Sequence, residues 1–194
     1  MGSGKSTVSH QLRQMGFEVL DADQVAHQVL AEKTEGEAEV FRTFGQVVQD
    51  PAGSLDRRAL GRLVFNDSEK LAALEAIIHP RVKQAVALAR EELRAAGCPV
   101  AFYDVPLLFE KNMRDQFDSI LVVSAAKHLR FARVQARSAL TAAEIEERNL
   151  RHLPAEFKEA SASAVIRNEG TLNDLRLEIE RALAMIGVDL PTSA

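Results

Sequence analysis

The chain has 194 residues, of which 46% are apolar and 27% charged, and its 24 basic and 28 acidic side chains give a formal net charge of −4. This composition indicates a globular protein with a sizeable core, and it excludes a disordered chain and the strongly basic surface of a typical nucleic-acid-binding protein. Cys98 is the one cysteine, so an internal disulfide is excluded, and no apolar run reaches the length of a bilayer-spanning helix. We therefore expect a cytoplasmic protein.

Hydrophobic periodicity, apolar runs and turn residues predict the elements of the first half of the chain. They are, in order, a helix over 6–15, a short strand over 17–23, a helix over 24–44, a polar loop over 49–57 and a helical region over 58–95. Pro80 lies inside the last region, where we expect it to bend or restart the helix.

The second half continues with apolar strands between basic or amphipathic helices. Its predicted elements are a strand at the start of 99–110, a strand over 119–125, a basic helical region over 126–158, a strand over 163–170 and a helix over 171–186. Thr141 and Glu144 have the spacing of a capping box within the basic region. Because strands alternate with helices, we predict one α/β domain, an open parallel sheet with helices on both faces and 58–95 as a helical insertion.

The first seven residues, MGSGKST, contain half of a phosphate-binding motif. Gly4, Lys5 and Ser6 match the end of the pattern G-x-x-x-x-G-K-[ST]. In such a loop, backbone N–H groups hold anionic oxygens at a helix N-terminus, the lysine reaches the outer phosphates and the hydroxyl coordinates Mg²⁺. A flexible, vector-derived segment before a capped helix is the alternative, and this half motif does not by itself decide between them.

Acidic residues follow two of the predicted strands. Asp21 and Asp23 end the first strand and Asp104 ends the second. The carboxyl ends of the strands are the edge at which doubly wound sheets bind ligands, so these acids are candidates for a general base or for holding a metal through water. Each of them could instead cap the helix or turn that follows. We favour Asp23 as the base and Asp21 as its support.

Five arginines lie in the basic region, namely Arg130, Arg133, Arg137, Arg148 and Arg151. Arginines on a mobile helical flap can close over a triphosphate, whereas a solvated helix face is the simpler reading for most of them. We expect two at most to touch a nucleotide. The five histidines show no zinc-binding spacing, and His79 by itself reads as a structural residue.

Six segments together identify a family. The runs GSGKST, DADQVAH, LDRRALGRLVF, IIHPRV, DVPLLFE and VIRNEG follow one another as in dephospho-CoA kinases, and the resemblance covers essentially the whole chain. It implies a P-loop NTPase-type fold with a core of about 1–30, 97–125 and 160–194, a helical acceptor-binding region of about 31–96 and a lid of about 126–158. It also implies transfer of the ATP γ-phosphate, with Mg²⁺, to the ribose 3′-hydroxyl of dephospho-CoA, the last step of coenzyme A synthesis.

The resemblance assigns roles position by position. The residues that it implies for ATP are Gly2, Ser3, Gly4, Lys5, Ser6, Thr7, Arg133, Arg137, Arg148 and Asn168, the last near adenine. Those that it implies for the acceptor are Asp21, Asp56, Arg57, Leu60, His79, Pro80, Asp104, Pro106 and Leu107. It makes Asp23, Lys5 and Arg137 catalytic, and it places the metal at Ser6 and, through water, at Asp21 and Asp104.

The resemblance has three departures. Ala162-Ser163 stands where the family has Ala-Asp, and His152 stands where a glutamine is common in the lid. The family also begins with a central strand and the first half of the loop, for which this sequence has Met1 alone. Without that strand its neighbours would lose hydrogen-bond partners at about 1–3 kcal/mol per buried group, against a total stability of about 5–15 kcal/mol. We therefore expect roughly ten further residues before Met1 in the natural protein, the length of the missing strand and half loop.

Two alternatives remain open at this point. The chain could be another small-molecule P-loop kinase, or, if the short N-terminus is real, a weakly active or non-catalytic binder of coenzyme A precursors with poor stability. A GTPase is disfavoured because the sequence has no N-K-x-D motif. We expect ATP and dephospho-CoA as partners, and neither nucleic acid nor a membrane.

Overall fold

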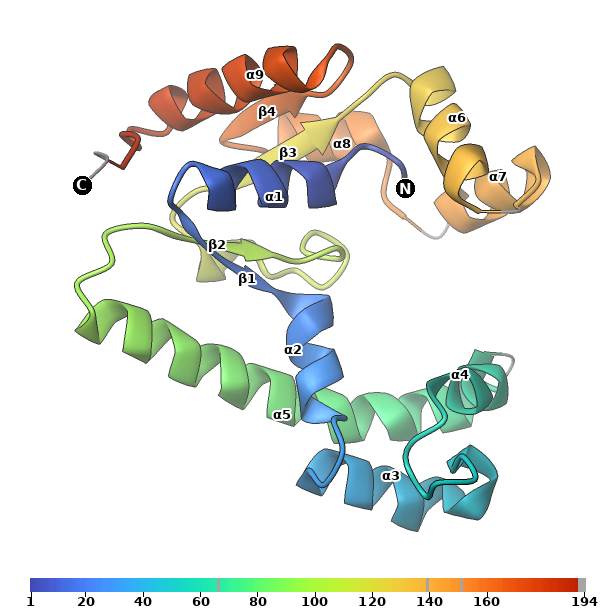
Figure 1. Cartoon of the computed structure of the whole chain (residues 1–194). Coiled ribbons are helices and arrows are strands. Elements are labelled where there is room, and N and C mark those ends of the chain that lie inside the picture. Colours follow the sequence, from blue (N-terminus) through green and yellow to red (C-terminus); the bar gives the residue numbers. More distant parts are fainter. Residues whose placement is uncertain (66, 139, 151, 192–194) are drawn as a thin grey trace. The chain divides into compact units, whose positions relative to one another are not determined.

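The structure, a computed structural model, describes residues 1–65, 67–138, 140–150 and 152–191. Its helices and strands (Figure 1) are, in chain order, α1 Lys5–Gln14, β1 Glu18–Asp21, α2 Ala22–Val29, α3 Glu35–Phe44, η1 Gly45–Val48, α4 Arg57–Phe65, α5 Ser68–Ala95, β2 Ala101–Asp104, η2 Arg114–Gln116, β3 Leu121–Ser124, α6 Lys127–Arg137, α7 Ala142–Leu150, α8 Ala155–Ala160, β4 Ala164–Arg167 and α9 Leu172–Met185. Contacts divide the chain into a first unit, Met1–Val19 with Asp104–Ala194, and a second unit, Leu20–Tyr103.

The first unit is built around the parallel pair β3 and β4, whose register runs from Leu121–Ala164 to Ser124–Arg167. Ala164 and Ile166 are buried, as the two-residue period of a strand requires for one covered face. Helix α9 packs on β4 through its own buried stripe, which includes Leu175, Ile179 and Leu183 (Figure 1). This packing fixes the end of β4, where Asn168 begins the next loop.

Two helices of this unit, α7 and α9, begin with reciprocal side-chain caps. The Thr171 hydroxyl accepts a hydrogen bond from the Asp174 N–H at 3.2 Å, and the Asp174 carboxylate accepts one from the Thr171 N–H at 2.8 Å. Thr141 and Glu144 form the same reciprocal pair at α7, which confirms the predicted capping box.

The strands form two separate sheets among the described residues, β1 with β2 and β3 with β4. We expected one open parallel sheet. A sheet becomes continuous only through strands that are hydrogen-bonded on both sides, and in the described part of the chain each strand has a single neighbour.

The second unit is a helical bundle with a core of its own. Its buried cluster consists of Leu30, Val40, Val48, Leu60, Val64, Leu74 and Ile77. Helix α2 contributes through Leu30 at its C-terminal end and contacts both α3 and α5. The unit therefore begins at Leu20 and extends to Tyr103, beyond the 31–96 expected for the helical region.

Three predicted helical stretches differ from the observed ones. The stretch 24–44 is divided into α2 and α3, where the Thr34 hydroxyl accepts from the Glu37 N–H and starts a new helix. The described part of the basic region contains three helices, the last of which begins after Pro154. Helix α5 instead runs through Pro80 without restarting. Proline has no N–H to donate to the Ala76 carbonyl, but Ala76 and Pro80 are both exposed, so water can take the place of the missing helical hydrogen bond. No helix of the described residues is both long and apolar enough to span a bilayer.

Candidate active site

The loop that precedes α1 is held in a conformation that requires glycine. Gly2 and Gly4 have φ of 77° and 93°, and the Gly4 carbonyl accepts hydrogen bonds from the Thr7 and Val8 N–H groups, both at 3.0 Å. A Cβ on Gly2 would lie 2.5 Å from the Arg130 carbonyl oxygen, and one on Gly4 would lie 2.0 Å from Asn168 Nδ2. Both positions therefore exclude any side chain, by backbone conformation and by the closeness of their neighbours.

The N-terminus of α1 is electrostatically uncompensated. Gly4 provides no side-chain cap and the first turn contains no acidic residue. The first N–H groups of a helix have no partner within it, and the helix dipole adds a partial positive charge there. The exposed Ser6 and half-buried Thr7 side chains lie in this turn. This end of α1 is suited to bind an anion.

Lys5 is anchored beside that helix end. Its ammonium is paired with Asp104 Oδ1, and Ser9 Oγ donates to Asp104 Oδ2 at 2.7 Å. The Asp104 side chain is 4% exposed and that of Lys5 is 41% exposed. An ammonium has three donors, so Lys5 keeps N–H groups for an anion while its position is fixed. Each Asp104 oxygen accepts one hydrogen bond here, and its metal role through water stays a prediction.

Two arginines of α6 adjoin the same loop, Arg130 through its backbone at Gly2 and Arg133 through Asn168. Arg133 Nη2 donates to Asn168 Oδ1 at 3.4 Å, and Asn168 Nδ2 donates to the Ser3 carbonyl at 2.8 Å. Within the described residues, Arg130 Nε and Arg133 Nη1 are buried and have no hydrogen-bond partner. Buried donors of this kind are costly, and an anion at the loop would satisfy them.

The field around the loop is positive. Burial, and then the charges of Arg130, Lys158 and Arg137, lower the pKa of the Met1 ammonium below its ordinary value. Arg137 ends α6, and Arg148 lies exposed in the last turn of α7. Arg151 is outside the described residues.

In the second unit, Asp21 and Asp23 have different positions at the start of α2. Asp21 Oδ1 accepts hydrogen bonds from the Asp23 N–H at 2.9 Å and the Gln24 N–H at 3.1 Å, so Asp21 is the helix cap. The Asp23 side chain is exposed in the first turn. Burial, and then the charges of Asp21 and Asp23, raise the pKa of Tyr103 above its ordinary value. Sequence reasoning missed Tyr103, although its place one residue before Asp104 at a strand end is a usable signal.

The residues expected at the acceptor have local roles in the second unit. Asp56 accepts from the Arg58 and Ala59 N–H groups at 2.9 Å, and its pKa is lowered chiefly by the bond from Ala59. Arg57 donates to the His27 and Leu30 carbonyls, both at 2.9 Å, and so closes the end of α2. Leu60 is 4% exposed in the core. Contact of these residues with an acceptor stays a prediction.

His79 and Pro80 lie on the exposed side of α5, with His79 Nε2 3.8 Å from Glu75. Pro106 and Leu107 lie in the turn after β2 in the first unit. The structure therefore brings together Lys5, Asp104, Arg133, Asn168 and the loop, and it distributes the expected acceptor residues over several elements.

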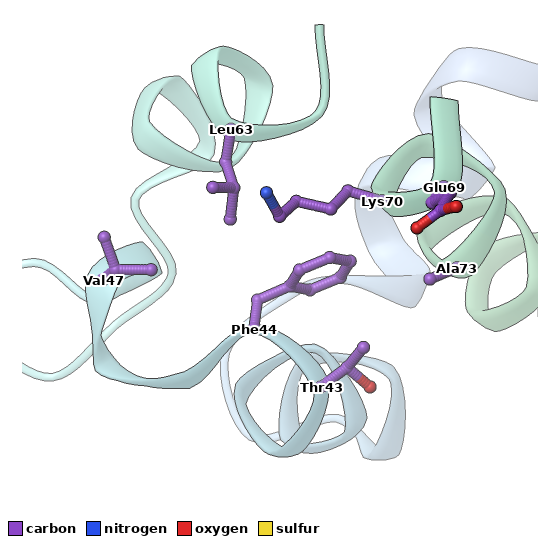
Figure 2. A pocket seen from close by; sticks show the side chains of 7 residues that line it. All are labelled: Thr43, Phe44, Val47, Leu63, Glu69, Lys70 and Ala73. Carbon is purple, nitrogen blue, oxygen red and sulfur yellow. The ribbon is translucent and has the colours of Figure 1, made fainter. Parts of the chain in front are cut away.

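A groove of about 430 Å³ lies between helices of the second unit, away from the predicted residues. Its lining is Thr43, Phe44, Val47, Leu63, Glu69, Lys70 and Ala73. Figure 2 shows Leu63, Phe44 and the carbon chain of Lys70 around it. None of the residues predicted for ATP or the acceptor lines this groove.

Glu110 is a further residue that sequence reasoning passed over. It accepts from Lys158 Nζ at 2.6 Å and from the Leu153 N–H at 3.2 Å, and His152 Nδ1 lies 3.4 Å away. Burial alone raises the pKa of Glu110, but the bonds from Lys158 and backbone N–H groups outweigh it and lower the pKa. Glu110 thus joins the turn after Asp104 to the region before and within α8. Its position at the end of DVPLLFE was the available signal.

Comparison with known proteins gives a consistent family. The family model for dephospho-CoA kinase matches residues 1–174. Dephospho-CoA kinase of Thermus thermophilus is 42% identical over 184 residues, covering 95% of this chain and 87% of that protein. The enzyme of the same name from Geobacter sulfurreducens is 39% identical, with 95% and 93% covered.

Solved structures agree with this result. A crystal structure from Thermus thermophilus has a TM-score of 0.79 at 42% identity and covers 95% of this chain and 92% of its own. Dephospho-CoA kinase from Campylobacter jejuni has a TM-score of 0.69 at 26% identity, with 96% and 92% covered. The predicted family, the P-loop type of α/β fold and the class of ATP-dependent phosphotransferase are confirmed. The chain belongs to the dephospho-CoA kinase family.

Proposed function

We propose that this protein transfers the γ-phosphate of ATP to the ribose 3′-hydroxyl of dephospho-CoA with the help of Mg²⁺. The observation that carries the proposal is the anchored Lys5, whose partner Asp104 is also held by Ser9, beside the uncapped N-terminus of α1. Membership of the dephospho-CoA kinase family supplies the acceptor.

We assign phosphate binding to the loop before α1 and to the basic residues around it. Backbone N–H groups of the first turn of α1 would receive phosphate oxygens, and Lys5 would use its remaining donors on the outer phosphates. The Arg130 backbone lies against Gly2, and Arg133 reaches the loop through Asn168. Arg130 Nε and Arg133 Nη1 have no hydrogen-bond partner among the described residues, and Arg137 adds positive charge near the Met1 ammonium. Such preorganised donors stabilise the negative charge of the transferring phosphoryl group.

The residues fit a Mg²⁺ ion that is held mainly by its substrate. Among the described residues no three His, Cys, Asp or Glu side chains gather into a metal cage. Mg²⁺ in kinase sites needs one or two protein oxygens and takes the rest from phosphates and water. The exposed Ser6 hydroxyl is the group that we assign to it, with Asp21 acting through water. The ion neutralises charge on the phosphates when it is bound.

Asp23 is the group that we assign to the attacking hydroxyl. Its carboxylate is exposed at the start of α2, where Asp21 fixes the backbone, and it would accept the proton of the 3′-hydroxyl. Phosphoryl transfer needs little covalent chemistry from protein, so placement of the two substrates accounts for most of the rate. We also propose that the enzyme acts in the cytoplasm, in keeping with its single cysteine.

A panel of acceptors tests the function. The protein is incubated with ATP, Mg²⁺ and either dephospho-CoA or a nucleoside monophosphate, and the products are separated by mass. We expect phosphorylation of dephospho-CoA at the 3′ position. Transfer to another acceptor alone would identify a different small-molecule kinase, and binding of dephospho-CoA without transfer would identify a non-catalytic binder.

A further inference from the structure

We propose that Asn168 is a positioning residue that orients the Gly4 N–H of the phosphate loop and the Arg133 guanidinium, and that it does not read the adenine base. The proposal rests on the function proposed above. It replaces the place near adenine that the family resemblance implied for Asn168.

Asn168 is firmly held by the sheet. Its N–H donates to the Ser124 carbonyl at 2.8 Å, which extends the β3–β4 ladder by one residue beyond Arg167. The residue is 7% exposed. A side chain that leaves a strand end in this way has a fixed origin and little freedom, so it can impose geometry on the groups that it contacts.

The first of these groups is the backbone of the phosphate loop. Asn168 Nδ2 donates to the Ser3 carbonyl at 2.8 Å. In a planar trans peptide the C=O and the following N–H point in opposite directions, and the described chain has no cis bond. Fixing the Ser3 carbonyl on Asn168 therefore turns the Gly4 N–H away from Asn168, where it is free to bind an anion.

The glycine at position 4 is required for this contact. Gly4 has φ of 93°, and a Cβ there would lie 2.0 Å from Asn168 Nδ2. The amide nitrogen occupies the space that a side chain would fill. Gly4 and Asn168 therefore act as a pair.

The second group is Arg133. Its Nη2 donates to Asn168 Oδ1 at 3.4 Å, and its Nη1 is buried with no partner in the described part of the chain. Asn168 thus holds one side of the guanidinium and leaves the other side for an anion. An amide that reads an adenine edge in a bidentate way offers both its donor and its acceptor. The Asn168 amide is 7% exposed, and its nitrogen and oxygen each already have a protein partner, so it is poorly placed for that contact.

Inorganic tripolyphosphate, which has phosphates but no base, separates the two roles. Binding of Mg²⁺-tripolyphosphate, ATP and GTP is measured by calorimetry for the wild type, Asn168→Ala and Asn168→Asp. The matched control is Asn173→Ala, at an exposed position of α9. We expect Asn168→Ala to weaken all three ligands by a similar factor of about tenfold, the loss of a well-placed hydrogen bond, with the ratio of ATP to GTP affinity unchanged.

Asn168→Asp separates the two contacts. The carboxylate would keep an acceptor for Arg133 but would place an oxygen against the Ser3 carbonyl, so we expect tripolyphosphate binding to fall at least as far as in Asn168→Ala. If either variant does not fold, Asn168→Ser, whose hydroxyl is too short to reach Ser3, provides the same comparison. Thermal unfolding without ligand detects a purely structural role, which would lower the midpoint and leave the affinities unchanged.

A lowered midpoint with unchanged affinities would overturn the proposal, and so would either of two further results. One is unchanged tripolyphosphate affinity together with an altered ratio of ATP to GTP affinity, which would make Asn168 a base reader. The other is wild-type tripolyphosphate affinity in Asn168→Asp. Neither touches the proposed function, which fails separately if the wild type does not phosphorylate dephospho-CoA.

Discussion

Asp104 shows how one buried carboxylate fixes the position of a lysine beside a helix N-terminus. It fixes the ammonium of Lys5 and receives the hydroxyl of Ser9, which lies one helical turn after Lys5 on α1. The side chain of a lysine is long and costly to immobilise. Because Asp104 holds it in advance, less of that cost falls on the binding of phosphate. The acid at this strand end thus has a positional role.

Asp23 and Asp21 allow a residue-scale test of the proposed base. We expect Asp23→Asn to lower kcat by about a hundredfold to ten-thousandfold, the usual range for loss of a general base, with little change in the KM for ATP. Steady-state kinetics with dephospho-CoA measures this. Near-normal turnover would remove Asp23 from the mechanism.

Asp21→Asn is the matched variant for that test. Asparagine caps helices as well as aspartate does, so α2 should keep its stability. A loss of activity in a stable Asp21→Asn enzyme would then report on the charge of Asp21, for which binding of metal through water is the proposed reason.

At the scale of elements, the turn after β2 is joined to α8 by an aromatic pair and an ion pair. Phe109 and Phe157 meet edge to face with centroids 6.4 Å apart, and Glu110 binds Lys158. Both contacts connect the turn that follows Asp104 with the region that follows the arginines of α6 and α7. The contribution of the Glu110 contacts to stability can be measured from the pH dependence of unfolding.

We expect Glu110→Gln to lower stability at neutral pH and to approach the wild type in acid. The pKa of Glu110 in the folded protein lies below its ordinary value of 4.5. The stabilisation is therefore fully present above the unfolded-state pKa and is lost as the pH falls through the lower, folded-state pKa. Urea unfolding of both proteins across that range measures the difference.

The control for this comparison is Glu156→Gln, at an exposed position of α8. His152 Nδ1 also lies 3.4 Å from Glu110. The free energies of unfolding of wild type and variants are therefore compared with one another at each pH. A difference between wild type and Glu110→Gln that stays constant from neutral to acidic pH would contradict the role of the carboxylate charge.

Pro80 offers a second test at the scale of an element. It interrupts the hydrogen bonds of α5 at an exposed position, so Pro80→Ala should raise the free energy of unfolding by about 1–2 kcal/mol, after allowance for the greater freedom of alanine in the unfolded chain. If Pro80 meets the acceptor, the same change raises the KM for dephospho-CoA. Gln84→Ala, at an exposed position of α5, is the control. A less stable Pro80→Ala protein would contradict the account of α5.

An element was predicted well where its ends depend on residues close to it in the sequence. The final helix was expected over 171–186 and is observed over Leu172–Met185, because its start depends on Thr171 and Asp174 alone. The division of 24–44 was missed because Thr34 had to be weighed against an uninterrupted helical pattern. The start of α3 also depends on a contact outside this stretch, because the Glu37 carboxylate accepts hydrogen bonds from the Lys33 N–H and from the N–H of Leu55, 18 residues further along the chain.

At the scale of the whole molecule, motif order was predictable and strand pairing was not. The phosphate loop, the acids at strand ends and the arginines were all predicted from short segments, and the family that these segments indicate matches residues 1–174. The roles of the individual residues stay predictions. Which strands pair, and the grouping of 20–30 with the helical bundle, depend on contacts between segments far apart in the chain. The partner of Asn168 is of this kind, since Ser3 lies 165 residues away.

The division into two units predicts where each substrate protects the backbone. A ligand that binds the folded state suppresses local opening at its site. We expect ATP with Mg²⁺ to slow amide hydrogen exchange in the first unit, at α1, α6 and the end of β4, and dephospho-CoA to slow it in the second unit. Exchange measured by mass spectrometry on the protein tests this. Protection by ATP confined to Leu20–Tyr103 would contradict the assignment of the phosphate site.

Tyr103 has a practical consequence of its own. The chain contains one tyrosine and no tryptophan, so its near-ultraviolet fluorescence comes almost entirely from this ring. The ring is half-buried in the field of Asp21 and Asp23. The emission of a phenol depends on its surroundings, so the protein carries a built-in optical reporter in the unit that holds the acids assigned to the acceptor. Occupancy there can be followed by emission without attaching any dye.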